Sequence, residues 1–160
     1  MASSNRTAAE LGETSLARLE QCLRAERSAV AAYDRALELT DAQDFAWTVL
    51  ELRVRHDARA RSIVRHLTAR GAAPPSTTLP RRGAGGEEKR RLGPSLLDAF
   101  EALEEHLLAF YERHPAGLDL ATRRFIERCL APDQKTTCAL LECASARVQF
   151  GAAPYAREVA

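Results

Sequence analysis

The fold is decided by the stretch LEQCLRAERSAVAAYDRAL (Leu19–Leu37) and by its second copy, LDAFEALEEHLLAFYER (Leu97–Arg113). A shift of 78 residues aligns the copies, with these pairs in register: Leu19 and Leu97, Glu26 and Glu104, Tyr33 and Tyr111. A repeat of this length indicates two similar halves. In each copy the glutamate stands where the apolar spacing of a helix calls for a leucine, which makes it the informative residue.

The composition favours one all-α domain. At 160 residues the chain is long enough to bury a full core. Alanine, leucine, arginine and glutamate dominate, and no stretch alternates apolar and polar residues as a strand does. The formal net charge of +1 gives no overall field that would select a nucleic acid or a membrane.

The chain offers no apolar run of about 18 residues and no signal peptide at its N-terminus, so we expect no membrane contact. Its four cysteines, which lack C-x-x-C spacing, are Cys22, Cys129, Cys138 and Cys143. In the absence of a secretion signal they indicate reduced thiols and a cytoplasmic protein.

Apolar spacing predicts an antiparallel four-helix bundle over residues 14–150, made of two helical hairpins joined by a long crossover linker. The expected helices cover residues 15–40, 45–70, 94–113 and 119–148, between a flexible N-terminus (1–13), the Pro- and Gly-rich linker (71–93) and a C-terminal tail (151–160). Thr14 or Ser15 is the expected cap of the first helix. Pro132 should kink the fourth helix or divide it.

Each expected helix carries one polar residue near its middle, within its apolar face: Glu26, His56, Glu104 and Asp133. In an antiparallel bundle the helix midpoints meet at one level, so these residues should form a single polar layer. Carboxylates and imidazole are ligands suited to iron, manganese or zinc. Burying several carboxylates without a cation is costly.

Two hairpins, a long crossover and this Glu and Tyr pattern resemble the ferritin-like superfamily, and most closely its small bacterial domains of unknown function. The resemblance covers about residues 14–148. Di-metal members use one Glu from each of two helices and a Glu-x-x-His from each of the others. By this resemblance Glu26 and Glu104 match the single glutamates and His56 matches a histidine. Arg53 and Leu130 stand where the two bridging glutamates would be.

Two interpretations of the layer follow. In the first, Arg53 and a protonated His56 neutralise Glu26 and Glu104 without a metal, and the protein acts by binding or self-association. In the second, Glu26, His56 and Glu104, with Asp133, hold iron, manganese or zinc in an oxidoreductase or a metal-handling protein. In this second interpretation the ligands would be held in place by residues that do not touch the metal, namely Arg53, Tyr33 and Tyr111. Whether the chain is an enzyme stays open.

Structural alternatives exist for each residue of the layer. Glu26 could lie at the rim of the bundle, and His56 could be an ordinary core histidine. Asp133 follows Pro132 and could cap a restarted helix segment. Tyr33 and Tyr111 could be core aromatics whose hydroxyls bond buried carboxylates.

Two surfaces suggest partners. The arginines of the second helix surround it and do not form one stripe, so we expect them to pair with acidic neighbours and not with a nucleic acid. The weaker alternative is a nucleic-acid or anion binder that uses this helix and the basic linker. The fourth helix is apolar over a wide arc that includes Cys138, Leu140, Leu141 and Ala144. A helix that is apolar on more than one side is buried on more than one side, which predicts a homodimer formed through this helix.

Overall fold

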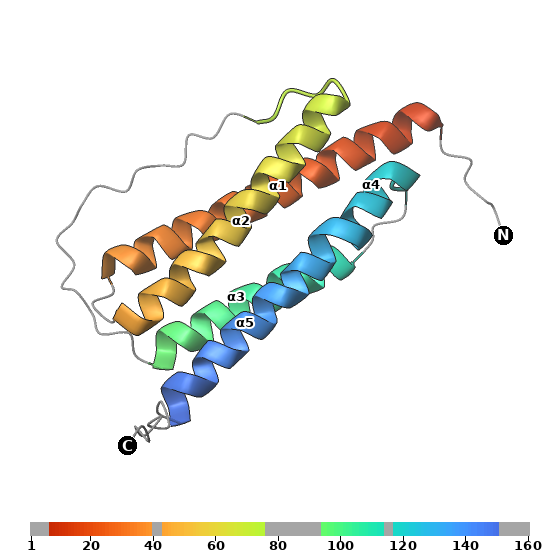
Figure 1. The fold of residues 1–160 in the computed structure, drawn as a ribbon. Helices are drawn as coiled ribbons and strands as arrows, with labels where there is room; N and C mark the ends of the chain where they lie inside the picture. Colours follow the sequence, from red (N-terminus) through yellow and green to blue (C-terminus); the bar gives the residue numbers. More distant parts are fainter. Residues whose placement is uncertain (1–6, 40–42, 76–93, 114–116, 151–160) are drawn as a thin grey trace, which may run out of the picture.

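A computed structural model describes residues 7–39, 43–75, 94–113 and 117–150. The elements of this part of the chain are all helical: α1 (Ala8–Leu39), α2 (Gln43–Ala69), α3 (Pro94–Glu112), α4 (Leu120–Phe125), η1 (Ile126–Leu130) and α5 (Ala131–Phe150). Because α4, η1 and α5 follow one another without a break, they form one continuous fourth segment, and four helical segments lie side by side (Figure 1). The prediction of an all-α chain is confirmed.

The apolar core is divided into two clusters by the polar layer. The first cluster contains Leu19, Ile63, Tyr111 and Leu130. The second cluster contains Tyr33, Leu52, Phe100 and Leu141. In each of the four segments the buried polar residues of the layer fall between the residues of the two clusters: Glu26 in α1, His56 and Arg59 in α2, Glu104 in α3, and Gln134 and Thr137 in the fourth segment. The layer therefore lies at one level inside apolar surroundings.

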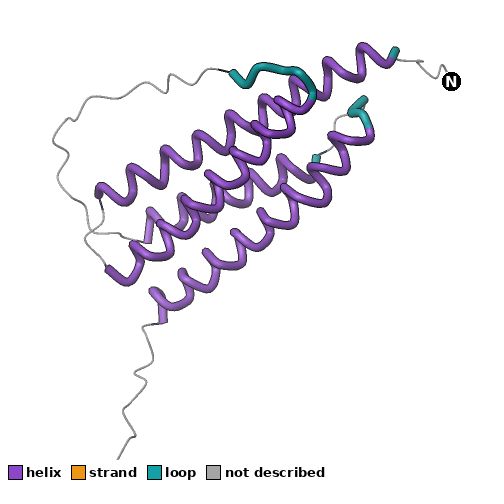
Figure 2. Tube along the Cα trace, turned by 45° about the horizontal axis from the view of Figure 1, so that its top comes forward, coloured by secondary structure: helices purple, strands orange, loops and turns teal. Residues whose placement is uncertain are grey.

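The order of the clusters gives the course of the chain. Along α1 and the fourth segment the chain passes from the first cluster to the second, and along α2 and α3 it passes from the second to the first. The helical tubes follow this course (Figure 2). The end of α2 and the start of α3 thus lie at opposite ends of the core. Most of the predicted linker and the whole predicted tail (residues 76–93 and 151–160) lie outside the described residues.

The first helix begins earlier than its apolar spacing predicted, at Ala8 and not at residue 15. Thr7 and Glu10 form a reciprocal capping box, in which Thr7 N donates to Glu10 Oε2 (2.8 Å) and Glu10 N donates to Thr7 Oγ1 (3.3 Å). Thr14 and Ser15 are not caps, because their hydroxyls donate to backbone carbonyls four residues earlier. The start of α1 is therefore set by the hydrogen bonds of its capping residues, which do not belong to the apolar stripe.

Helix α2 ends at a glycine with left-handed backbone. Gly71 has φ = 74°, and the amides of Gly71 and Ala72 donate to the carbonyls of Thr68 (2.9 Å) and Leu67 (3.1 Å). This bonding closes the last turn of α2 as a Schellman motif.

Two alanine substitutions should therefore have opposite effects on stability. Nothing lies within 4 Å of a Cβ built at Gly12 or at Gly71, so backbone conformation alone decides each result. Gly12→Ala, inside α1, should raise the free energy of unfolding by about 1 kcal/mol, because glycine is a poor helix former. Gly71→Ala should lower it by about 1 kcal/mol, because alanine resists positive φ. Urea unfolding measures both changes, and equal signs would contradict this account.

The fourth segment passes Pro132 through a widened turn. Residues Ile126–Leu130 are π-helical, and Ala131 N donates to Ile126 O, five residues earlier. Proline has no amide hydrogen and its ring would meet the carbonyl of the preceding turn, so a widened turn just before it lets the helix continue. The extra residue in that turn also shifts the inward positions, and the next buried side chains are Gln134, Thr137 and Leu141.

Candidate functional site: a buried polar layer

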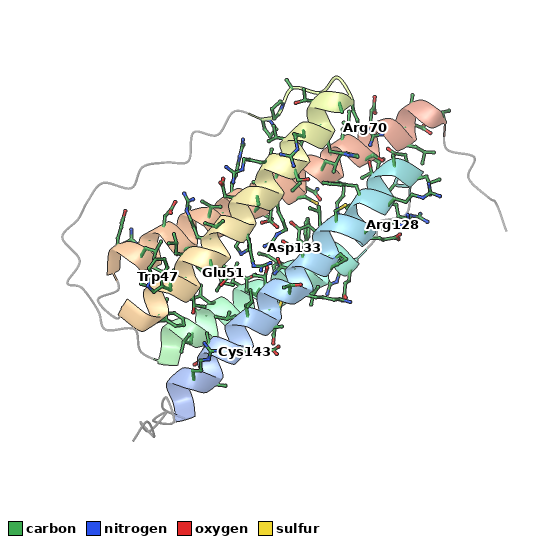
Figure 3. The ribbon with its side chains drawn as sticks, in the orientation of Figure 1. Trp47, Glu51, Arg70, Arg128, Asp133 and Cys143 are labelled. Atoms are coloured by element: carbon green, nitrogen blue, oxygen red, sulfur yellow. The ribbon has the colours of Figure 1, made fainter. Side chains whose placement is uncertain are left out.

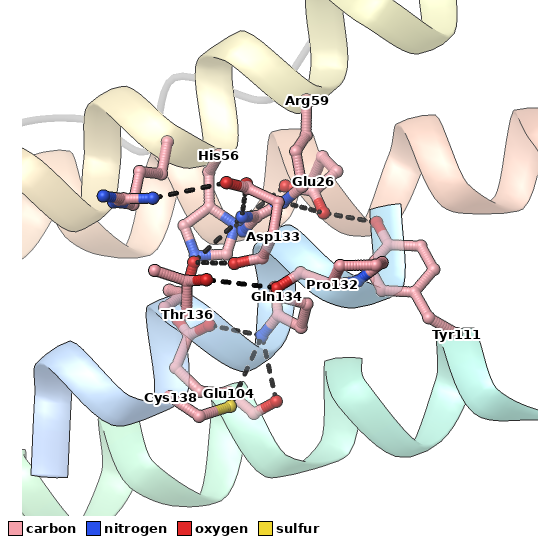
Figure 4. A network of polar contacts seen from close by, with 12 residues as sticks. Glu26, His56, Arg59, Glu104, Tyr111, Pro132, Asp133, Gln134, Thr136 and Cys138 are labelled. Atoms are coloured by element: carbon pink, nitrogen blue, oxygen red, sulfur yellow. Dashed lines mark hydrogen bonds and ion pairs between the residues drawn. The ribbon is translucent and has the colours of Figure 1, made fainter. Parts of the chain in front are cut away.

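His56 lies at the centre of the layer, between the two repeated glutamates (Figure 4). Its Nδ1 lies 2.8 Å from Glu26 Oε2 and its Nε2 lies 2.9 Å from Glu104 Oε1. The three side chains, which come from α1, α2 and α3, are at most 1% exposed. The structure thus brings together three of the four predicted layer residues, and Glu26 does not lie at the rim of the bundle.

The two repeated tyrosines cross over between the halves. Tyr33 of α1 donates to Glu104 Oε1 of α3 (2.5 Å), and Tyr111 of α3 donates to Glu26 Oε1 of α1. Burial, followed by the neighbouring carboxylates, raises the pKa of both phenols, so they remain hydrogen-bond donors. Each tyrosine bonds the glutamate of the other copy, which explains the shared spacing of seven residues.

The arginine of the layer is Arg59, and the prediction of Arg53 is wrong. Arg59 is 3% exposed, and its Nε donates to Glu26 Oε1 at 2.9 Å. Arg53 instead pairs with Asp34 at the surface (2.8 Å). The two arginines lie three residues after and three before His56, so they deviate from its direction by about 60° on opposite sides of α2. Each side of α2 meets different neighbours, and these neighbours decide which of the two arginines points into the core.

Asp133 lies at the edge of the layer and does not cap a helix. Its side chain is 37% exposed and accepts from Arg59 Nη1 (2.5 Å) and Arg55 Nη1 (3.2 Å). Arg59 Nη1 also donates to Thr137 Oγ1 (2.9 Å). The carboxylate therefore connects the buried arginine with a partly exposed one.

Gln134 is the inward residue of the fourth segment, and periodicity alone missed it. It is fully buried, and its Nε2 donates to Glu104 Oε2 (2.6 Å) and to Glu104 O (3.0 Å). The repeat itself holds the signal, since the same shift of 78 residues places His56 on Gln134 and Arg59 on Thr137. Leu130, at the other bridging position of the resemblance, is buried in the first apolar cluster.

The charges of the layer balance when His56 is protonated. Burial opposes the imidazolium, but the hydrogen bonds to Glu104 and Glu26 outweigh it and raise the pKa of His56. For Glu104, burial is likewise outweighed, chiefly by the hydrogen bond from His56, and its pKa is lowered. The imidazolium and Arg59 then neutralise the two glutamates. Arg59 Nη2 itself lies 2.9 Å from His56 Nδ1, so the two cations are in direct contact. The carboxylate of Glu26 bonds both of them and thereby offsets their repulsion.

The layer in this arrangement does not fit a bound metal. A histidine that binds a metal must offer a bare nitrogen, and both nitrogens of His56 lie at hydrogen-bond distance from carboxylates. The oxygens of Glu26 and Glu104 accept from His56, Arg59, Tyr33, Tyr111 and Gln134. Among the residues that the structure describes, no group of three or more His, Cys, Asp or Glu could hold a metal ion.

Several arginines of α2 pair with acidic residues as expected, though the partners differ. Arg61 Nη2 lies 2.9 Å from Asp57 on the same helix. Arg70, which directly follows α2, bonds Asp119, just before α4, and Thr122, within α4. The expected pairing with α1 is found between Arg53 and Asp34 and between Arg59 and Glu26.

No helix in the described ranges is both long enough and apolar enough to cross a membrane. Comparison of the chain with protein-family models, curated proteins and solved structures gave no match.

Proposed function

We propose that this chain is a ferritin-like antiparallel four-helix bundle whose polar layer works without a metal, and that the protein acts by binding or self-association and not by catalysis. The observation that carries the proposal is the double engagement of His56, whose two ring nitrogens both face carboxylates. With Arg59 beside it, the histidine supplies the positive charge that a metal would supply between Glu26 and Glu104. The layer then serves to hold the four helices in one register.

The course of the chain supports the ferritin-like part of the proposal. Each hairpin is antiparallel, while α2 and α3 run in the same direction, so the chain must pass from one end of the core to the other between them. This course matches the arrangement in which one long crossover links the helix pairs. The crossed Tyr and Glu bonds between α1 and α3 add a second similarity between the halves. The described cysteines are all unpaired thiols, which supports a cytoplasmic location.

Elemental analysis tests the metal-free layer. Protein purified without a metal-affinity step should contain far less than one equivalent of iron, manganese or zinc, and its unfolding midpoint should not change when these ions are added. Glu26→Ala and Glu104→Ala should leave the metal content unchanged, as should the exposed control Glu13→Ala. Nearly one metal per chain that disappears in both layer variants and persists in the control would replace this proposal with the metal-dependent alternative.

A further inference from the structure

The internal repeat includes the second helix of each hairpin. Under the same shift of 78 residues, these buried residues of α2 and of the fourth segment coincide: Leu52 with Leu130, His56 with Gln134, Arg59 with Thr137, and Ile63 with Leu141. The two hairpins are thus built on one pattern of inward positions. Their outward positions should also be equivalent, so the outer groove of one hairpin can be compared residue by residue with that of the other.

Each hairpin has an outer groove, and the two grooves carry opposite charge. The groove between α1 and α2, here called the basic groove, has a volume of about 480 Å³ and is lined by Arg27, Arg61 and Arg65, with Asp57 and Val64. The groove between α3 and α5, here called the acidic groove, has a volume of about 290 Å³ and is lined by Glu101, Glu105 and Glu142, with Cys138 and Ser145.

One equivalent position reverses its charge between the grooves, and a second differs in charge. Arg27 in the basic groove corresponds to Glu105 in the acidic groove, and the neutral Val64 corresponds to Glu142. A folding core alone does not require this difference, because these side chains line outer grooves and the core positions of both hairpins are already filled. The opposite charges of the two grooves make the two hairpins complementary to each other.

The acidic groove also contains a hydroxyl without a partner. Ser145 is 4% exposed, and its Oγ has no hydrogen-bond partner among the described residues. A buried hydroxyl without a partner is unfavourable, and a donor entering the groove would relieve this cost. An arginine side chain offers several such donors together with the positive charge that the three glutamates require.

The outer face of α2 offers such side chains beside exposed apolar residues. Trp47, Leu50 and Val54, spaced three and four residues apart, are 71%, 39% and 48% exposed. Trp47 is labelled near the start of α2 in Figure 3. Arg61 and Arg65 follow on the same face, and the side chain of Arg61 is 64% exposed. This face therefore combines an apolar stripe, of the kind found in interfaces, with arginines that can leave their own groove.

We propose that copies of this chain associate head to tail, with Arg61 and Arg65 of one copy entering the acidic groove of the next. This inference specifies the self-association in the proposed function and rests on it. The two hairpins lie on opposite sides of the bundle (Figure 1), so one copy can use its basic groove and its acidic groove at once. A contact between two different surfaces of the same chain forms a ring or a filament.

Sedimentation measures this association. At about 50 mM NaCl the average mass should rise above the monomer value of 17.6 kDa as the concentration increases from 10 to 200 μM, and it should return to that value at about 0.5 M NaCl, where charges are screened. A monomer at every concentration and at both salt concentrations would overturn the inference. That result, combined with a metal-free layer, would leave the proposed function as a binding protein.

A charge-swap pair identifies the surfaces. Arg61→Glu/Arg65→Glu makes both grooves acidic, and Glu105→Arg/Glu142→Arg makes both basic, so each variant alone should be monomeric at low salt. An equimolar mixture should associate again, because each variant then meets its complement. Matched controls that change the same net charge on other exposed residues, Arg123→Glu/Arg124→Glu and Glu13→Arg/Glu38→Arg, should associate like the wild type. Failure of the mixture to associate, or loss of association in the controls, would overturn the proposed interface.

Discussion

Glu26→Ala should lower the free energy of unfolding by about 3–5 kcal/mol, the range found when one member of a buried ion pair is removed. The substitution takes a carboxylate away from His56, Arg59 and Tyr111 at the same time. It leaves two buried cations with one buried carboxylate, Glu104, and the partly exposed carboxylate of Asp133. Urea unfolding followed by helical circular dichroism measures the change.

Glu20→Ala in the same helix is the matched control. Glu20 pairs with Arg24 at 3.6 Å, and the two side chains are 39% and 57% exposed, so solvent screens their attraction. This substitution should change stability by no more than about 0.5 kcal/mol. If the two variants lost similar stability, the layer would not be the buried charge cluster described above.

A double-mutant cycle measures the interaction between Glu26 and Arg59 separately from the packing that each substitution removes. Arg59→Ala alone leaves Glu26 and Asp133 without their shared partner, while the Glu26→Ala/Arg59→Ala variant leaves neither carboxylate nor guanidinium of this pair. The double variant should therefore be more stable than the sum of the two single losses predicts, by about 1–3 kcal/mol. Additive losses would mean that the Arg59 contact with Glu26 contributes nothing.

The sequence predicted those parts of the structure that depend on helical spacing and on the repeat. It indicated the four helical segments, the inward direction of Glu26, His56 and Glu104, and the tyrosines that face buried carboxylates. These features follow from spacing within one helix and from the repeat of that spacing in the second copy.

The errors have physical causes that spacing cannot reveal. Arg53 and Arg59 are equivalent on a helical wheel centred on His56, and the choice between them depends on which neighbour each side of α2 meets. Asp133 was expected in the layer, but the widened turn before Pro132 shifts the inward position to Gln134. The repeat could have corrected this error, because position 134 is the counterpart of His56.

Stability should fall as pH rises above about 6.5, with a slope no steeper than about −1.4 kcal/mol per pH unit for this single group. The pKa of His56 is raised in the folded protein, against burial, by its hydrogen bonds to Glu104 and Glu26. A raised pKa means that the folded state keeps a proton that the unfolded state releases near pH 6.5. The stabilisation is therefore complete below that pH and is lost as pH rises through the folded pKa.

Other titrating groups act mainly outside this window. The pKa of His66 is lowered by burial and by Arg70, so His66 affects stability at more acidic pH. Burial raises the pKa of Cys22 to about 12, so its contribution begins only where unfolded thiols ionise, near pH 8.5. Glu104, with its lowered pKa, contributes stability that is present above about pH 4.3 and lost as pH falls through its folded pKa.

His56→Gln should remove the fall in stability above about pH 6.5 while lowering stability at every pH. Glutamine can still bond one of the two carboxylates, but it cannot take up a proton, so proton binding would no longer differ between the folded and unfolded states in this range. Urea midpoints at half-unit pH steps, measured for both proteins, provide the comparison. A wild-type stability that stays constant or rises over this range would mean that His56 is neutral when folded. The two glutamates would then lack one of their cations, and the layer would need a different positive charge, which returns a metal to consideration.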